Sequence, residues 1–135
     1  MTAPAADLQK AVVAALAADA ELLALLGGPK IFDHAPPNAM FPYVTFGRTS
    51  VYDWSTGTEA GAEQILSLHV WSKERGRRET LDILERCRQL LDDVSLTLDD
   101  NHLVNMRLAF SEVSREDDLA IYRGMLRFRG VTESV

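Results

Sequence analysis

The stretch "AEQILSLHVWSKERGRRETLDILERCRQLL", residues 62–91, changes its hydrophobic period halfway along. In the first part, apolar residues alternate with polar ones, as in a β-strand with one buried face. One side of that strand holds Leu66, Leu68 and Val70, and the other side holds Ser67 and His69. From about Arg77 to Leu91 the apolar residues recur at helical spacing instead. The shared helix face holds Thr80, Ile83, Leu84, Cys87, Leu90 and Leu91. The stretch therefore predicts a half-buried strand followed by an amphipathic helix.

The N-terminal segment predicts a first long helix that is interrupted near Asp19. Its apolar stripe consists of Leu8, Val12, Ala15 and Leu16. If the helix continued, Asp19 would enter this stripe, and a buried unpaired carboxylate is costly. We therefore expect Asp19 to cap a second short helix that runs through Leu26, because Asp is a favoured N-cap residue. The sequence Gly27-Gly28-Pro29 then ends that helix.

Strand patterns occupy the rest of the chain. The three prolines between residues 31 and 46 predict an irregular loop over 34–42, with a strand starting after Pro42. The sequence "TGTEAGAE" provides the turn before the next strand. After the second long helix we expect a short strand over 95–98 and a turn at Asp99-Asp100-Asn101. A strand follows with Val104, Met106, Leu108 and Phe110 on one side.

The final strand, "IYRGMLRFRGVTE" at residues 121–133, has two chemically different sides. One side carries Tyr122, Leu126 and Phe128, and the other carries Arg123, Met125, Arg127 and Arg129. The element order is helix, two strands, helix, then two or three strands, with short connections inside each strand group. This order predicts an α+β fold, a largely antiparallel sheet with two main helices packed on one face, in a single domain over residues 1–135.

Composition narrows the function classes. The chain has 20 acidic and 14 basic residues and a net charge of −6, which argues against a protein that wraps nucleic acid over most of its surface. A single cysteine, Cys87, forms no intramolecular disulfide and no cysteine-based zinc site, so a reducing compartment is expected. The N-terminal segment has neither a basic start nor about 18 uninterrupted apolar residues. We expect neither a signal peptide nor a membrane span.

Catalytic and cofactor-binding patterns are absent from the sequence. The histidines His34, His69 and His102 have neither zinc-ligand spacing nor a recognisable nucleophile partner. The paired aspartates fall at predicted helix ends and turns, where Asp is favoured for local hydrogen bonding. The glycines form neither a P-loop nor a dinucleotide fingerprint. We therefore expect no enzyme activity, no metal and no cofactor.

Two basic groups and one aromatic turn are the candidate contact residues. The first group, Lys73, Arg75, Arg77 and Arg78, lies just behind the opening strand. Of these, Arg77 and Arg78 lie where the second long helix begins, and the positive end of the helix dipole makes arginine unfavourable there. The second group is Arg123, Arg127 and Arg129, which repel one another unless acidic groups meet them. For the first group the alternatives are a mobile solvated loop and a contact with acidic protein surface or DNA phosphates. For the second group one alternative is a solvated edge or sheet face, neutralised by Glu112 or other neighbours. The turn adds Asp53 and Trp54, where the indole either caps the core or anchors a partner.

Several motifs together resemble one family. They are "IFDHAPPNAMFPYVTFG", "DWSTGTEAGAEQILSLHVWSKERGRRE", "LLDDVSLTLDD" and "RGMLRFRGVTE". The most diagnostic are Pro42-Tyr43-Val44, Asp53-Trp54-Ser55, and Leu68-His69-Val70-Trp71-Ser72 followed by Arg75-Gly76-Arg77. In these the chain resembles the small tail-completion or tail-terminator proteins of long-tailed phages, prophages and gene transfer agents. The resemblance runs through nearly the whole chain.

The resemblance implies a structural protein that assembles with itself into a ring, typically a hexamer, on the head-proximal end of the tail tube. Such a ring stops polymerisation of the major tail tube protein and offers its other face to the head-side connector protein. DNA passes through its channel as non-specific cargo, and no membrane is involved. It also implies assembly in the bacterial cytoplasm and a final place at the head–tail junction of a virion or gene transfer agent particle. We expect both basic groups to serve subunit–subunit or ring–tube contacts.

Two other readings of the same residues remain open. A nucleic-acid-binding module would use the arginine groups with Trp54 or Trp71 as stacking platforms, and its affinity for DNA would depend on salt. A small enzyme or ligand-binding α+β domain would place His69 and acidic partners in a pocket.

Overall fold

The computed structural model describes residues 3–58, 60–73, 77–116 and 120–134. Helices and strands follow the order α1 (Pro4–Ala17), α2 (Ala20–Leu26), β1 (Ile31–Phe32), β2 (Tyr43–Asp53), β3 (Gly61–Ser72), α3 (Arg78–Leu91), β4 (Asn101–Glu116) and β5 (Ile121–Ser134). No helix in these ranges is long and apolar enough to cross a membrane.

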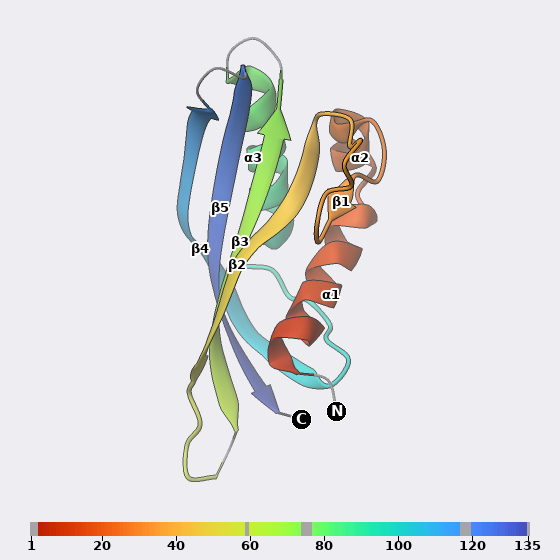
Figure 1. The fold of residues 1–135 in the computed structure, drawn as a ribbon. Coiled ribbons are helices and arrows are strands. Elements are labelled where there is room, and N and C mark those ends of the chain that lie inside the picture. The colour runs from red at the N-terminus through yellow and green to blue at the C-terminus, as the bar shows by residue number, and fades with distance from the viewer. Residues whose placement is uncertain (1–2, 59, 74–76, 117–119, 135) are drawn as a thin grey trace.

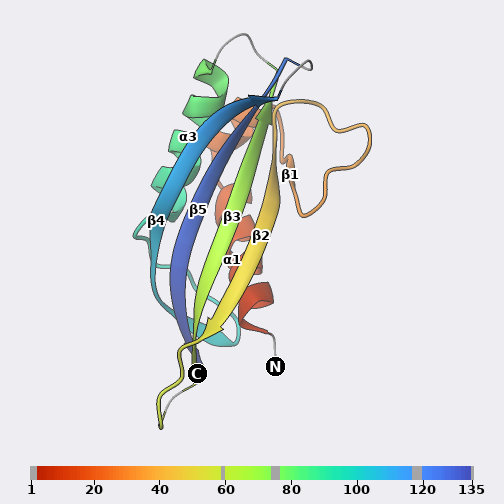
Figure 2. The ribbon, with the colours of Figure 1, turned by 60° about the vertical axis from the view of Figure 1, so that its left-hand side comes forward.

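The strands form one sheet in the order β1-β2-β3-β5-β4 (Figure 1). The pairs β2–β3, β3–β5 and β5–β4 are antiparallel, and only the two-residue β1 runs parallel to its neighbour. Strands β4 and β2 lie toward opposite edges of the sheet, and the β2–β3 hairpin extends beyond the helices at one end (Figures 1 and 2). The predicted α+β class and the largely antiparallel sheet are therefore confirmed.

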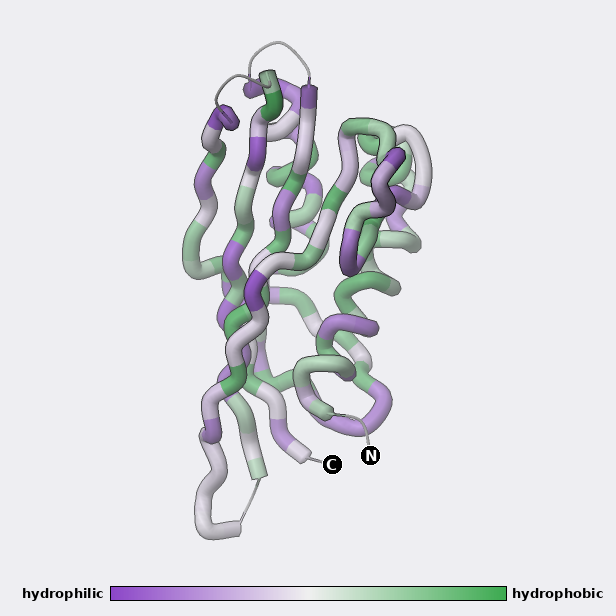
Figure 3. Tube along the Cα trace, in the orientation of Figure 1, coloured by the Kyte–Doolittle hydropathy of each residue, from purple (hydrophilic) through white to green (hydrophobic). Residues whose placement is uncertain are grey.

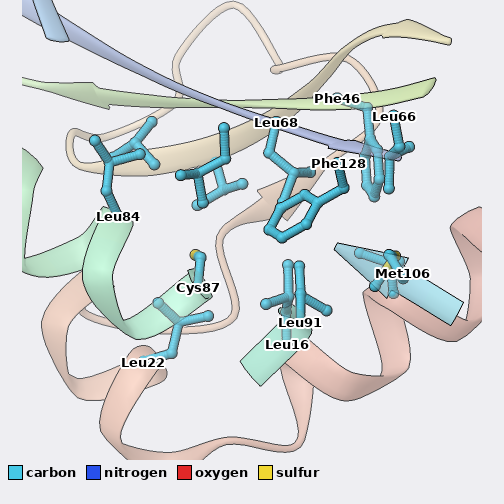
Figure 4. Close-up of a cluster of buried hydrophobic side chains, with 14 of the residues drawn as sticks. Leu16, Leu22, Phe46, Leu66, Leu68, Leu84, Cys87, Leu91, Met106 and Phe128 are labelled. Carbon is cyan, nitrogen blue, oxygen red and sulfur yellow. The ribbon is translucent and has the colours of Figure 1, made fainter. Parts of the chain in front are cut away.

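All three described helices lie on the same face of the sheet (Figure 2). Hydrophobic and hydrophilic residues alternate along the strands (Figure 3), so each strand presents one apolar side to the helices. Leu68 of β3 and Phe128 of β5 are fully buried there, against Leu16 of α1 and Cys87 of α3 (Figure 4). The sheet face covered by helices is called the covered face below, and the other is called the open face.

The predicted break between the first two helices is confirmed at Asp19. Its carboxylate accepts a hydrogen bond from the Leu22 backbone N–H at 2.8 Å, which makes it the N-cap of α2. The same carboxylate also binds the Arg86 guanidinium of α3 at 2.7 Å, so the cap joins two helices. Gly27 then ends α2 with a φ of 78°, a backbone conformation that favours glycine.

The expected strand over 95–98 is wrong: residues 94–98 are irregular, although Leu98 is buried in the core. A strand needs a neighbour, and β4 already fills the edge of the sheet beside β5. The turn after this segment is held instead by the buried carboxylate of Asp7 in α1. Asp7 accepts hydrogen bonds from the Asp99 and Asp100 backbone N–H groups, both at 2.9 Å, and from the Asn101 side chain at 2.8 Å.

The expected apolar side of β4 is only partly correct. Met106 is buried and Leu108 is half-buried, but Val104 and Phe110 are each 43% exposed. The pairing with β5 is irregular between Leu103 and Asn105 and again between Leu108 and Phe110. Each irregularity is a bulge with one extra residue in β4, and an extra residue shifts the alternation of faces. The bulges explain why a strict two-residue period fails along this strand.

Candidate interaction surface

The predicted contact residues lie at two ends of the sheet and along a row between them. Lys73 follows β3, Arg77 is the N-cap residue of α3, and Arg78 is its first residue. These three residues form the basic end group. Arg75, which was predicted to belong to it, lies outside the described residues, as does Gly76. Asp53 and Trp54 lie at the opposite end of the sheet, where the β2–β3 hairpin begins.

Aromatic rings support the basic end group. The Lys73 ammonium lies 4.7 Å from the centre of the Phe41 ring, and the Arg77 guanidinium lies 5.5 Å from the centre of the Tyr122 ring. Arg78 forms an ion pair with Asp82 one helical turn later, at 3.2 Å, and its side chain is 88% exposed. Cation–π contacts at exposed sites hold a side chain in place without neutralising its charge. The group therefore presents ordered positive charge at the end of the sheet.

Arg123, Arg127 and Arg129 form a row along β5 on the open face, called the arginine row. Arg123 lies 3.5 Å from Glu116 and 6.0 Å from the centre of the Trp71 ring. Because Arg123 is opposite Trp71 near the end of β3, the row begins beside the basic end group. The structure thus brings together two groups that are about 50 residues apart in the sequence, through the β3–β5 pairing.

The remaining arginines of the row have different partners. Arg129 binds Glu63 of β3 at 2.8 Å, and this pair raises the pKa of the guanidinium and lowers that of the carboxyl group. Arg127 lies 5.4 Å from the centre of the Phe110 ring. The acidic partners of the row are therefore Glu116 and Glu63, whereas the sequence pointed to Glu112, which lies opposite Met125. The positive charge of the row is neutralised only in part, because the Phe110 ring beside Arg127 carries no charge.

In the aromatic turn, Asp53 makes hydrogen bonds within the turn, whereas Trp54 is exposed. The Asp53 carboxylate accepts a hydrogen bond from the Ser55 backbone N–H at 3.0 Å. Hydrogen bonds from the Ser55 side chain and backbone lower the pKa of Asp53, so its charge holds the turn. Trp54 donates its backbone N–H to the Gly61 carbonyl at 2.9 Å, while 50% of the residue surface stays exposed. The indole is therefore available to a partner.

A row of aromatic rings on the open face was not anticipated from the sequence. The rings of Tyr43 and Trp71 are stacked, with centres 6.4 Å apart, and so are those of His69 and Trp71, with centres 6.1 Å apart. The indole N–H of Trp71 donates to the Thr45 hydroxyl at 3.0 Å. Every second residue of β2 and β3 falls on this face, so the period-two pattern of aromatic residues was the signal that could have revealed the row.

The groups with catalytic or metal-binding potential lie apart from one another. Burial and then the nearby Arg123 charge lower the pKa of His69, whose ring contacts Trp71 rather than an acidic partner. Cys87 is buried, and burial raises the pKa of its thiol to about 12. Across the described ranges, three or more metal-ligating side chains nowhere come close enough to hold a metal ion. In the described ranges the candidate contacts therefore consist of charged and aromatic side chains.

Comparison with known proteins identifies a family for this arrangement. Residues 10–133 match the family model described as tail completion protein gp17. Among solved structures, a chain in a structure described as the virion of a native gene transfer agent particle is similar to this one. That chain is 30% identical in sequence, with a TM-score of 0.90, and the match covers 99% of this chain and 100% of that chain. No curated protein matches the chain significantly.

Proposed function

The chain belongs to the family of tail completion protein gp17, a family of structural tail proteins, and we propose that it forms the ring that terminates a tail tube. In this proposal the whole chain is one tail-terminator domain, and copies of it close into a ring, with a hexamer expected. The ring stops polymerisation of the major tail tube protein, joins the tube to the head-side connector protein, and lets DNA pass through its channel. The subunit assembles in the bacterial cytoplasm and remains at the head–tail junction.

The observation that carries this proposal is the near-complete match to a chain of a gene transfer agent virion, with a TM-score of 0.90. The match covers 99% of this chain and 100% of that chain, so it extends over nearly the whole backbone. A structural role is also consistent with a surface whose charged side chains contact rings and acidic groups rather than a reactive cavity.

The two ends of the sheet suit a ring with two different partners. The basic end group is at one end, and the aromatic turn with Asp53 and Trp54 is at the other. A cyclic ring uses the same end of every subunit on the same side, so one side of the ring would be basic and the other aromatic. Complementary charge fixes the register of such contacts and discourages wrong partners. We assign the basic end group to a protein contact, because a conduit must let DNA slide.

The mass of the native particle, measured by light scattering at two concentrations with and without the tail tube protein, tests the proposal. A ring-sized species, either free or formed only with tube protein, is expected. A subunit that stays monomeric, does not bind tube ends in electron micrographs, and is dispensable for tail length in particle-producing cells would overturn it. Salt-dependent binding of the isolated subunit to DNA would then favour the nucleic-acid-binding alternative.

The variant Arg77→Glu tests the basic end group. An acidic residue is favourable at a helix N-terminus, so we expect the subunit to remain folded. Capping of tails is expected to fail because the charge at the contact is reversed. Lys10→Glu is the matched control, since Lys10 is an exposed residue of α1 outside both basic groups, paired with Asp99. Tails of normal length with Arg77→Glu would remove the basic end group from the contact.

A further inference from the structure

The large exposed apolar residues of the described chain gather near the two edges of the sheet. Each of these residues has between 43% and 73% of its surface exposed. Val51 and Tyr52 lie on β2, Trp54 directly follows it, and Met40 lies just before it; Val104 and Phe110 lie on β4, and Leu81 lies on α3. The residues of the β2 group lie at both ends of that strand, and those of the β4 group are spread along β4 and α3. Large exposed apolar side chains are favoured anchors in interfaces. Two such groups, near opposite edges of the sheet, require an explanation.

We propose that the β2 edge of one subunit docks against the β4 edge of the next, and that this contact closes the ring. The inference rests on the ring proposed above and adds the surfaces that build it. A closed cyclic ring needs two different patches on each subunit, one for each neighbour. The two edges of one sheet meet this requirement directly, because they face in opposite directions (Figure 2). The occupant of each edge is a second copy of this chain.

The direction of the strands supports this arrangement. Three successive antiparallel pairings separate β2 from β4, so these two strands run in opposite directions. If the ring axis is parallel to the strands, every copy of β2 has the same direction. The β2 strand of a neighbour is then antiparallel to the β4 strand that it meets. This relative direction determines which side chains of the two edges can meet at the same height.

The apolar residues of the two edges lie at matching levels. Following the register across the sheet, Tyr52 is opposite Glu63, Glu63 is opposite Val131, and Val131 is opposite Asn105. Val104, the extra residue of the first β4 bulge, directly precedes Asn105. A neighbour placed at the same height therefore brings Tyr52 beside Val104. The bulge that appeared to break the pattern of β4 exposes the residue that this contact needs.

One charged contact is also available across the two edges. Arg48, an exposed residue, lies within the irregular stretch of β2 between Phe46 and Thr49. At this height the β4 edge carries Asp92 and Asp93, which follow the C-terminus of α3. The Asp92 carboxylate accepts the Leu108 backbone N–H at 2.8 Å, and the Asp93 backbone N–H donates to the Met106 carbonyl at 2.8 Å. Within the subunit Asp92 already lies 3.7 Å from both Arg88 and Arg107, so the charge that a neighbour's Arg48 would meet here is mainly that of Asp93. The heights agree, since Thr49 is level with Leu108 through Leu66 and Phe128.

Hydrogen bonds within the subunit occupy part of each edge, which explains why the edges can be exposed before assembly without pairing with other chains. Asp92 and Asp93 occupy backbone groups in the middle of the β4 edge, and β1 pairs with Val44 and Thr45 on the β2 edge. An unguarded long edge strand invites pairing with any other chain. With both edges partly blocked, the contact depends on side chains at fixed heights rather than on backbone pairing. The strand ends, including the basic end group, remain available to the tube.

Cysteine pairs in assembled particles test the edge contact. Within one subunit β2 and β4 are three strand spacings apart, roughly 14 Å, which is too far for a disulfide. The double variant Tyr52→Cys/Val104→Cys is therefore expected to give disulfides only between subunits, as a ladder up to the size of the ring. Met40→Cys/Val104→Cys is the matched control, since it uses the same two edges but joins residues at different heights. We expect no ladder from this control.

Two results would overturn the edge contact: no ladder from the 52/104 pair, or equal ladders from both pairs. Treatment of wild-type particles with an amine cross-linker separates this failure from a failure of the ring itself. Oligomers of this chain without a 52/104 ladder would leave the ring standing and remove the edge contact. If the amine cross-linker yields no oligomer of this chain, both proposals fail.

A mixing experiment checks that the contact joins two different edges. Tyr52→Asp damages only the β2 edge, and Val104→Asp damages only the β4 edge. Each variant alone is expected to be folded and monomeric at concentrations where the wild type, with tube protein, forms rings. An equal mixture of the two is expected to form heterodimers, because one intact edge of each kind remains. Rings formed by either variant alone would overturn the proposal.

Discussion

The two faces of β5 use alternate residues of one strand in opposite ways. On the covered face Leu126 and Phe128 are almost completely buried, and their partners are apolar side chains of α1, α3 and the neighbouring strands. On the open face Arg127 and Arg129 lie among a ring and a carboxylate, exposed to solvent. Burial of apolar area supplies most of the free energy of folding, whereas exposed charge pairs supply little. Substitutions on the open face therefore cost little stability, so its residues can serve contacts with partners.

The largest effect that separates the two faces is expected from Phe128→Ala. Phe128 is fully buried in the centre of the core, so removal of its ring leaves a cavity. Such substitutions lower the free energy of unfolding by about 3–5 kcal/mol. Urea denaturation followed by circular dichroism measures the change. A loss of less than about 1 kcal/mol, the ordinary scale of point substitutions, would mean that the covered face is not the main source of stability.

A smaller loss is expected where a helix approaches the covered face closely. A Cβ atom added at Gly124 would lie 2.7 Å from Leu84 and 2.8 Å from Thr80, both in α3. Gly124→Ala should therefore destabilise the protein by about 1–3 kcal/mol through overpacking. Gly130→Ala on the same strand is the control, since its nearest neighbours would be 3.6 Å away. Equal stabilities of the two variants in urea denaturation would show that α3 moves without cost.

The covered face is also the part that the sequence predicts well. Periodicity alone places the helix after Arg77, the buried side of β3 and both sides of β5, and capping chemistry places the break at Asp19. These elements follow local rules, in which the buried residues recur at the period of the helix or strand. The family resemblance depends on motifs in the strands and in the turns and loops beside them, and the family is confirmed.

The parts that the sequence does not predict depend on partners that are distant in the chain. The residues over 95–98 have a strand-like pattern but no strand beside them, and Asp7, about 90 residues earlier, fixes the turn that follows. The bulges at Val104 and before Phe110 arise from the pairing with β5 and leave no local signal. The sequence predicted which residues belong to the candidate site. Their arrangement, at two ends of the sheet and in one row along β5, follows from the order of the strands. Long-range pairing is what one sequence does not reveal.

A modest, pH-dependent effect is expected from Asp19, which joins α2 to α3 on the covered side. Hydrogen bonds from Arg86 and then from the Leu22 backbone outweigh burial and lower the pKa of Asp19 to about 2. A depressed pKa stabilises the folded state above the ordinary value of 3.8, and this contribution is lost as the pH falls toward 2. Asp19→Asn should therefore be less stable than the wild type at pH 7, and the difference should shrink between pH 4 and pH 2.

Denaturation curves at a series of pH values measure this difference. Asparagine also caps helices, so the variant removes the charge while the cap remains. Glu21→Gln is the control, because Glu21 lies 3.1 Å from the same guanidinium but its side chain is 65% exposed. We expect a smaller loss from the control. A difference for Asp19→Asn that stays constant from pH 7 to pH 2 would show that the carboxylate charge has no part in joining the helices.

The smallest effect on stability, and the sharpest distinction between the faces, is expected from Arg127→Ala. Arg127 is exposed and contacts the Phe110 ring, so the free energy of unfolding should change by no more than about 0.5 kcal/mol, as at other surface positions. Capping of tails should nevertheless weaken if the arginine row meets acidic partner surface. Because exposed charges are screened by salt, raising the ionic strength should bring the wild type closer to the variant. An Arg127→Ala protein that is as stable as the wild type and caps tails equally well at low salt would mean that the row is only a solvated face. A variant that is clearly destabilised would mean that the open face contributes to folding after all, and the contrast between the two faces of β5 would not hold.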